Sequence, residues 1–200
     1  MIHSLANRMA SIFVLYGESS EENADIYAYA CEAVIAFLIN LLLGLIVALV
    51  FGRFFEGIVF ILGFWLLRRY TGGYHAKTHF NCILAFSCIL VSAMLFLSVA
   101  TWLGFAEYLA VVVAGLALVG IISIAVKERV MRLSDVTSNL EVKLQGIWLA
   151  FGMFLFCIVD LYIISSQIGL SVALSMFSVF GSMAYAMVYK HFLTGGGEEL

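Results

Sequence analysis

The sequence predicts an all-α, polytopic membrane protein with about six transmembrane helices, and three observations support this fold class. Of the 200 residues, 64% are hydrophobic and only 12% are charged, and the mean hydropathy is +1.09. A soluble domain has about 25% charged residues. The smaller charged fraction of this chain cannot cover a globular surface. The apolar residues fall into runs about as long as a bilayer-spanning helix, and none shows the alternation of a strand.

Residues 1–17 predict an amphipathic helix that lies in the membrane interface. Apolar side chains recur every three or four positions from Ile2 to Tyr16, with polar side chains between them. A short cytosolic helix packed on the bundle fits the same pattern. Gly17 ends the pattern, and Ser19–Glu22 then offers an N-cap and acidic residues for the next helix.

Six apolar runs are the predicted spans. The first, 31–52, contains Asn40, which we expect to hydrogen-bond to another helix. The second, 54–67, is short and contains Glu56, so it either crosses with its ends at the interface or forms a re-entrant segment. The remaining predicted spans are 80–103, 108–126, 144–164 and 168–189.

Loop charge predicts the orientation of these spans. Lys and Arg are concentrated in the loops at 68–79 and 127–143, whereas the connectors near 104–107 and 165–168 have none. The positive-inside rule then places both basic loops and both termini in the cytoplasm. Because this parity requires six crossings, we favour a second span that crosses.

One membrane-embedded domain is predicted over residues 1–194, followed by a disordered tail at 195–200. The four cysteines form no CxxC pair, so no disulfide framework is expected. Cys88 and Cys157 lie in apolar runs, where we expect small buried hydrophobic residues. There is no basic tract typical of nucleic-acid binding, and we expect no cofactor.

The residues suited to chemistry are concentrated in one polar stretch, 68–82, between the second and third predicted spans. A cysteine thiolate is favoured by a nearby histidine, by cations and by a helix N-terminus, and Cys82 is near all three. A glycine pair lets the backbone approach a substrate, and an arginine can hold an oxyanion or a carboxylate. The stretch reads Arg68-Arg69-Tyr70-Thr71-Gly72-Gly73-Tyr74-His75-Ala76-Lys77-Thr78-His79-Phe80-Asn81-Cys82.

Spacing alone leaves the partner of Cys82 open. On a straight helix His79 is the near neighbour of Cys82, and His75 lies about 10 Å away along the axis. His75 approaches Cys82 only if the segment bends or the helix begins late. The two histidines and Cys82 also resemble a metal site, but no fourth ligand is evident, so no metal is expected. Lys77 and the two arginines can equally be ordinary topology determinants.

A transporter or exporter is the alternative class of function. Asp160 is the main ionisable residue within a predicted span, and a carboxylate at that depth is a functional hypothesis by default. The sequence offers it no evident basic partner.

The polar stretch resembles the accessory gene regulator B family, which are polytopic membrane cysteine endopeptidases of bacterial peptide quorum sensing. The resemblance rests on R-R-Y-T-G-G-Y-H-A-K and on the six residues between His75 and Cys82. It implies that Cys82 is the nucleophile and His75 its catalytic partner. It also implies that Arg68 and Gly73 support the oxyanion or the substrate, and we extend this expectation to Arg69.

The resemblance further implies a signalling propeptide with an acidic C-terminal tail as the substrate. The tail would be removed through an acyl-enzyme thioester, and the propeptide's own thiol would then close a thiolactone. A bacterial cell membrane location and a homodimer are expected from the family. Basic residues expected to hold the tail are Lys77, Lys127, Arg129 and Arg132, and candidates to orient His75 are Asn81, Asp135, Glu141 and Asp160. Family members often carry prolines in the loop at 127–143, and this chain has none.

Overall fold

The computed structural model describes residue 8 and residues 24–71, 79–131, 138–164 and 167–194. Every regular element in this part of the chain is helical, which confirms the all-α prediction. The predicted interfacial helix, apart from Arg8, and the predicted tail lie outside the described residues. The long helices are α2 (Ala24–Val50), α3 (Phe54–Thr71), α4 (His79–Trp102), α5 (Ala106–Met131), α6 (Ser138–Val159) and α7 (Ile168–Thr194), and the π-helical turn η2 (Asp160–Ile164) extends α6.

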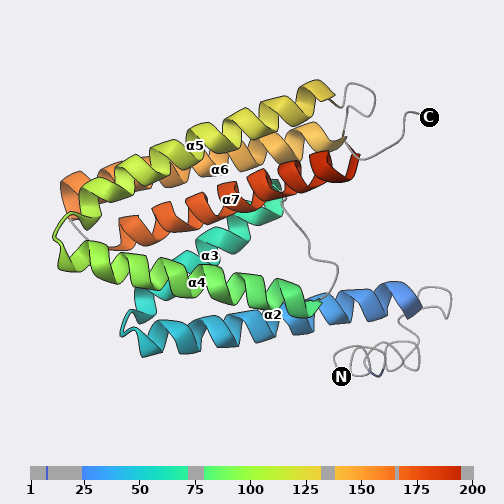
Figure 1. Ribbon diagram of the computed structural model, residues 1–200, viewed down its shortest axis with the longest axis horizontal. Coiled ribbons are helices and arrows are strands. Elements are labelled where there is room, and N and C mark those ends of the chain that lie inside the picture. Colours follow the sequence, from blue (N-terminus) through green and yellow to red (C-terminus); the bar gives the residue numbers. More distant parts are fainter. Residues whose placement is uncertain (1–7, 9–23, 72–78, 132–137, 165–166, 195–200) are drawn as a thin grey trace.

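The helices run alternately up and down between the two ends of the bundle (Figure 1). The short connectors at 51–53 and 103–105 lie at one end, together with the start of α7. The ends of α3 and α5 and the starts of α4 and α6 lie at the other end, with the start of α2 and the end of α7. Both basic loops therefore border the same end of the bundle, as the loop charges predicted.

Five of the described helices are long and apolar enough to cross a membrane, and α3 is the exception. It has 18 residues, which makes it about 27 Å long. Its first turn contains Glu56 and its last turn contains Arg68 and Arg69, so charges limit its apolar length. Because α3 packs against α2, α6 and α7, neighbouring helices cover much of its surface. Full crossing by α3 stays a prediction.

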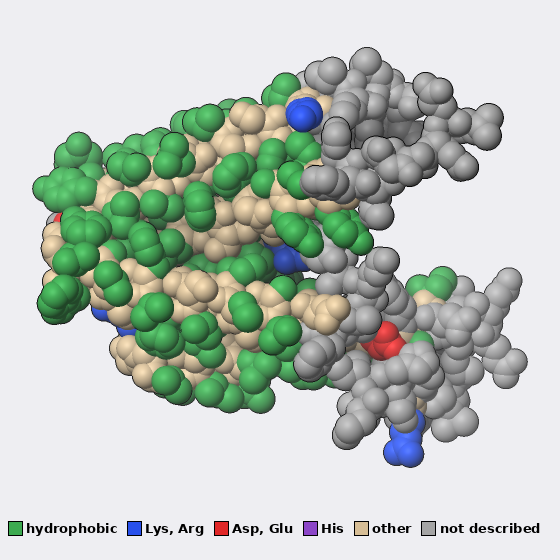
Figure 2. All heavy atoms as spheres, in the orientation of Figure 1, with side chains coloured by type: hydrophobic (Ala, Val, Ile, Leu, Met, Phe, Trp, Pro, Cys, Tyr) green, Lys and Arg blue, Asp and Glu red, His purple; other side chains and the backbone are tan. Residues whose placement is uncertain are grey.

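Apolar side chains form both the interior and the exterior of this bundle. Phe60 and Leu67 of α3, Leu90 of α4 and Met176 of α7 are fully buried. Large apolar side chains also cover the outer faces of the helices (Figure 2). Lipid tails are as apolar as leucine, so an apolar exterior suits a membrane and not water.

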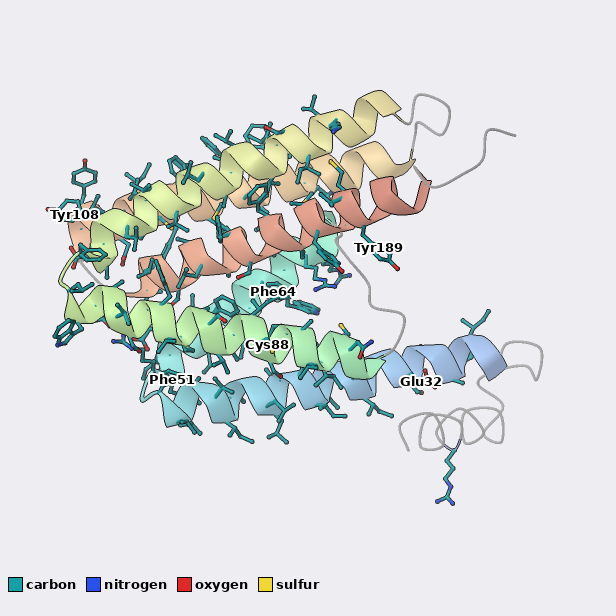
Figure 3. All side chains as sticks on the ribbon, viewed as in Figure 1. Glu32, Phe51, Phe64, Cys88, Tyr108 and Tyr189 are labelled. Atoms are coloured by element: carbon teal, nitrogen blue, oxygen red, sulfur yellow. The ribbon has the colours of Figure 1, made fainter. Side chains whose placement is uncertain are left out.

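Exposed aromatic side chains mark the two ends of the bundle. Trp102, Tyr108 and Tyr162 are all exposed near the end that carries the short connectors. At the other end, Tyr185 is exposed and stacks with Tyr189 at a centroid separation of 6.1 Å. Figure 3 shows Tyr108 and Tyr189 at these opposite ends. Trp and Tyr are enriched at both membrane interfaces, so this placement fits helices that span the bilayer.

Two glycines bring other helices close to α3. A Cβ atom added at Gly63 would lie 2.6 Å from the Oγ atom of Ser175 on α7. A Cβ atom added at Gly146 of α6 would lie 3.1 Å from side-chain atoms of both Tyr70 and Thr71, in the last turn of α3. Small residues at such contacts allow close packing in membranes, and here they fix the C-terminal half of α3.

Arg53 ties three elements together at the end of the short connectors. Its Nε–H donates to Ser98 Oγ on α4 at 3.1 Å, and its guanidinium also donates to Gln167 Oε1, just before α7. Glu56, one turn into α3, forms an ion pair with it at 3.7 Å. The Arg53 side chain therefore links α3, α4 and the start of α7, at the end of the bundle opposite to the polar stretch.

Asp160 acts as a cap for α7. Its carboxylate accepts a hydrogen bond from the backbone N–H of Gly169 at 3.1 Å, and the residue is 1% exposed. The first N–H groups of a helix lack intrahelical acceptors, and a negative charge there is favoured by the helix dipole. This contact gives the intramembrane carboxylate a structural role.

Two predictions about single side chains are wrong. Cys88 is exposed, although Cys157 is buried as predicted, and all four cysteines are free thiols. Within an apolar run, the sequence does not distinguish positions that face lipid from positions that face the bundle, because both surroundings are apolar. The side-chain oxygen of Asn40 is buried without a hydrogen-bond partner in the described part of the chain, so the expected bond to another helix does not form there.

Candidate active site

Cys82 lies in the first turn of a helix. Because α4 begins at His79, Cys82 is its fourth residue, and its side chain is half-buried. The N–H groups of a first turn have no intrahelical acceptors, and the helix dipole is positive there. The position that was predicted for this cysteine, near the start of a helix, is confirmed.

The thiol lines an apolar groove of about 860 Å³ between α4 and α7. Figure 2 shows a hollow between the layers of the bundle on one side of the molecule. Each helix lines the groove along one face, because the lining positions are three or four residues apart. On α4 they include Cys82, Ala85, Phe86, Ile89, Ala93 and Phe96, and on α7 they include Leu174, Phe177, Ser178, Gly181, Ser182 and Tyr185.

Arg68 enters the same groove from the last turn of α3 and is its only charged lining residue among those described. Its guanidinium carbon lies 5.5 Å from the centroid of the Phe64 ring. That ring in turn lies 5.3 Å from the ring of Phe86, one helical turn after Cys82. Figure 3 shows Phe64 between α3 and α4. Cation–π and aromatic contacts therefore connect Arg68 with the part of α4 that follows Cys82.

The neighbouring Arg69 lies outside this groove. Its side chain is exposed, with the guanidinium carbon 5.8 Å from the centroid of the Trp65 ring. Adjacent residues of a helix point about 100° apart, so only one of two successive arginines can reach the groove. Arg68 therefore lines the groove and Arg69 does not, although both were expected at the site.

Several predicted site residues lie elsewhere or outside the described residues. Lys127 is exposed near the end of α5, and Arg129 belongs to the same helix. Asn81 is exposed beside Cys82. Asp160 lies at the opposite end of the bundle from Cys82, which removes it as a residue that orients a base there (Figure 1). Residues outside the described part are Gly73, His75, Lys77, Arg132 and Asp135.

The described residues contain no group of three His, Cys, Asp or Glu side chains that could hold a metal ion. His79 is the first residue of α4 and lies three positions before Cys82 in the sequence.

A family model described as accessory gene regulator B matches residues 6–188. The chain belongs to the accessory gene regulator B family. The match spans the polar stretch, the helices from α2 to α6 and most of α7, so the resemblance noticed in one motif extends over nearly the whole chain. Membership in the accessory gene regulator B family connects this membrane protein with the processing of quorum-sensing peptides. No curated protein and no solved structure matches the chain.

The α7 wall of the groove was missed by the sequence-based interpretation. Small or polar residues at Ser178, Gly181, Ser182 and Tyr185 recur at helical spacing within an apolar run. This periodic stripe is the signal that could have revealed the groove in this accessory gene regulator B protein, because such residues leave space beside a neighbouring helix.

Proposed function

We propose that this protein is a membrane cysteine endopeptidase that removes the C-terminal tail of a signalling propeptide and promotes closure of a thiolactone ring. The observation that carries the proposal is that Arg68 and Cys82, from two different helices, line the same end of one apolar groove. Membership in the accessory gene regulator B family supports the class of substrate.

In the first step, His75 takes the proton of the Cys82 thiol, and the thiolate attacks the carbonyl carbon at the tail junction. The carbon–nitrogen bond breaks, the leaving amine receives the proton from His75, and a thioester remains on Cys82. We propose that Arg68, which lines the groove with Cys82, and the N–H groups at the start of α4 hold the negative charge that develops on the carbonyl oxygen.

In the second step, a thiol within the propeptide attacks the thioester carbonyl. A new carbon–sulfur bond forms as the bond to Cys82 breaks, and the proton of the incoming thiol passes through His75 to Cys82. One thioester replaces another, so the exchange needs no oxidant or external energy source. Apolar groove walls such as Phe86 and Phe177 disfavour water, which would otherwise hydrolyse the intermediate.

We propose that the substrate tail is bound at the basic end of the bundle, on the cytoplasmic side of the membrane. Arg68 lies in the groove at this end, and Lys127 is exposed near the adjacent end of α5. Basic loops are retained on the cytoplasmic side of a membrane, and an acidic tail is attracted to the same charges.

The transporter hypothesis has no comparable support. It depends on Asp160, whose carboxylate accepts a hydrogen bond from the N–H of Gly169 at the start of α7. A carboxylate that caps a helix is explained by that contact.

The experiment that tests the function follows release of the tail from a labelled propeptide by protein reconstituted in lipid nanodiscs. The wild-type protein should release the tail, Cys82→Ala should not, and Cys31→Ala should release it at the wild-type rate. Cys31 is the matched control because it is a free cysteine that does not line the groove. Tail release by Cys82→Ala would contradict the proposal.

A further inference from the structure

The groove extends far beyond the residues that react. From Cys82 to Phe96 it follows α4 over 14 residue steps, which corresponds to about 21 Å of helix. Its volume of about 860 Å³ lies within the range of about 300–1,000 Å³ that encloses drug-sized ligands. Attack on one peptide bond needs only the first few ångströms, so the remainder is available for the substrate.

The walls of the groove are suited to apolar groups. Phe86, Phe96 and Phe177 contribute aromatic surface from two helices. The hydroxyl groups of Ser92 and Ser178 donate to carbonyl oxygens of their own helices, at 2.8 and 2.7 Å. Their donors are therefore already used, and a polar group that entered here would gain little in exchange for its lost hydration.

Charge is confined to one end. Arg68 is the only charged lining residue among those described, and it lies at the same end as Cys82. A charged substrate segment placed deep in the groove would find no partner, whereas a negatively charged segment at the Cys82 end would find Arg68. The two sides of the scissile bond thus meet different surroundings.

We propose that the groove binds apolar side chains of the substrate segment on the acyl side of the scissile bond, and that it selects substrates by those side chains. The inference rests on the proposed function. The acyl fragment must stay while it is bound to Cys82, and the other fragment must leave before the second thiol attacks. The proposed tail is acidic and suits the Cys82 end, where Arg68 lies, so the apolar remainder of the groove is left for the acyl side.

A lipid acyl chain is the competing occupant, because it is equally apolar. A peptide is favoured because the groove is continuous with Cys82 and Arg68, which suit a carbonyl and a negative charge at the same end. Lipid in the groove of the resting protein would be displaced by substrate side chains of matching shape.

The test narrows the groove without touching the reacting residues. A Cβ atom added at Gly181, which lines the groove, meets no atom within 4 Å, so Gly181→Leu places its side chain in open groove space. Gly152→Leu on α6 is the matched control, because that position is equally open and does not line the groove. Gly181→Ala gives a milder variant should the leucine impair folding.

Each variant is assayed for kcat/KM of tail release with two propeptides, one with large apolar residues at the two positions before the scissile bond and one with alanine there. Gly181→Leu should lower kcat/KM for the large apolar propeptide by at least about tenfold and leave the alanine propeptide unchanged. Gly152→Leu should change neither. Alkylation of Cys82 by a small thiol reagent should proceed equally in all three proteins.

Equal loss for both propeptides, or loss for neither, would overturn the inference. A change in co-purified lipid without a change in propeptide preference would assign the groove to lipid instead. Failure of the proposed function is a separate result, because tail release would then persist in Cys82→Ala. If Cys82→Ala is inactive and Gly181→Leu does not discriminate, only the groove inference is wrong.

Discussion

Arg68 and Cys82 line the same end of one groove although they belong to different helices. Two aromatic rings connect them: the guanidinium of Arg68 lies over Phe64, and Phe64 contacts Phe86, one turn after the cysteine. The contact between Phe64 and Phe86 therefore links α3 and α4 one helical turn away from Arg68 and from Cys82. The proposed site depends on this relationship.

Replacing Arg68 should impair catalysis far more than replacing Arg69. Only Arg68 lines the groove, and removal of one donor to an oxyanion costs on the order of 100-fold in kcat. Steady-state cleavage of the labelled propeptide by Arg68→Ala and Arg69→Ala measures the difference. Arg68→Lys should recover part of the loss, because it restores the charge but not the two-pronged hydrogen bonding. Equal effects of the two alanine variants would argue against this assignment.

His75→Ala should abolish tail release, and His79→Ala should retain it. His79 is the first residue of α4, and the family resemblance assigns the base to His75. Both variants are compared by tail release at saturating substrate and by thermal stability, which controls for folding. Activity that survives in His75→Ala and disappears in His79→Ala would transfer the role of base to His79.

Gly146→Val should reduce tail release because it moves the last turn of α3. The added side chain meets Tyr70 and Thr71 at 3.1 Å, and overpacking of this kind costs about 1–3 kcal/mol. Gly152→Val in the same helix is the control, since no atom lies within 4 Å of its added Cβ atom. The result is read from thermal melting together with kcat/KM. If both valine variants behave alike, α6 does not position Arg68.

Asp160→Ala should lower stability by about 1 kcal/mol, because the N–H of Gly169 loses its acceptor. Asp160→Asn retains an acceptor oxygen and should restore most of the stability. Thermal melting and tail release of both variants test this role. Loss of function in Asp160→Asn with unchanged stability would revive the transporter hypothesis.

The fold class and the position of the helices could be predicted from the sequence because apolar length is a strong signal. Each predicted span from 31–52 to 168–189 corresponds to one helix of the structure. The packing could not be predicted in the same way. In a membrane both faces of a helix are apolar, so the sequence did not distinguish the exposed Cys88 from the buried Cys157.

The candidate site was predictable only in part, and for a related reason. Cys82 and Arg68 were singled out because polar residue types are rare in this chain and concentrated in one stretch. Adjacent Arg69 has the same residue type, and only the direction of its side chain separates it from the site. The α7 wall is distant in sequence and composed of small or apolar residues, so no chemical signal connected it with Cys82.

The acyl-enzyme thioester on Cys82 can be detected by the mass of the protein after incubation with a propeptide whose internal cysteine is replaced by alanine. Without that thiol the second step stops, so the wild-type protein should gain the mass of the acyl fragment on a peptide that contains Cys82. The adduct should be cleaved by hydroxylamine, as a thioester is, and should be absent from Cys82→Ala. Tail release without any adduct on Cys82, or an adduct on another residue, would contradict the account.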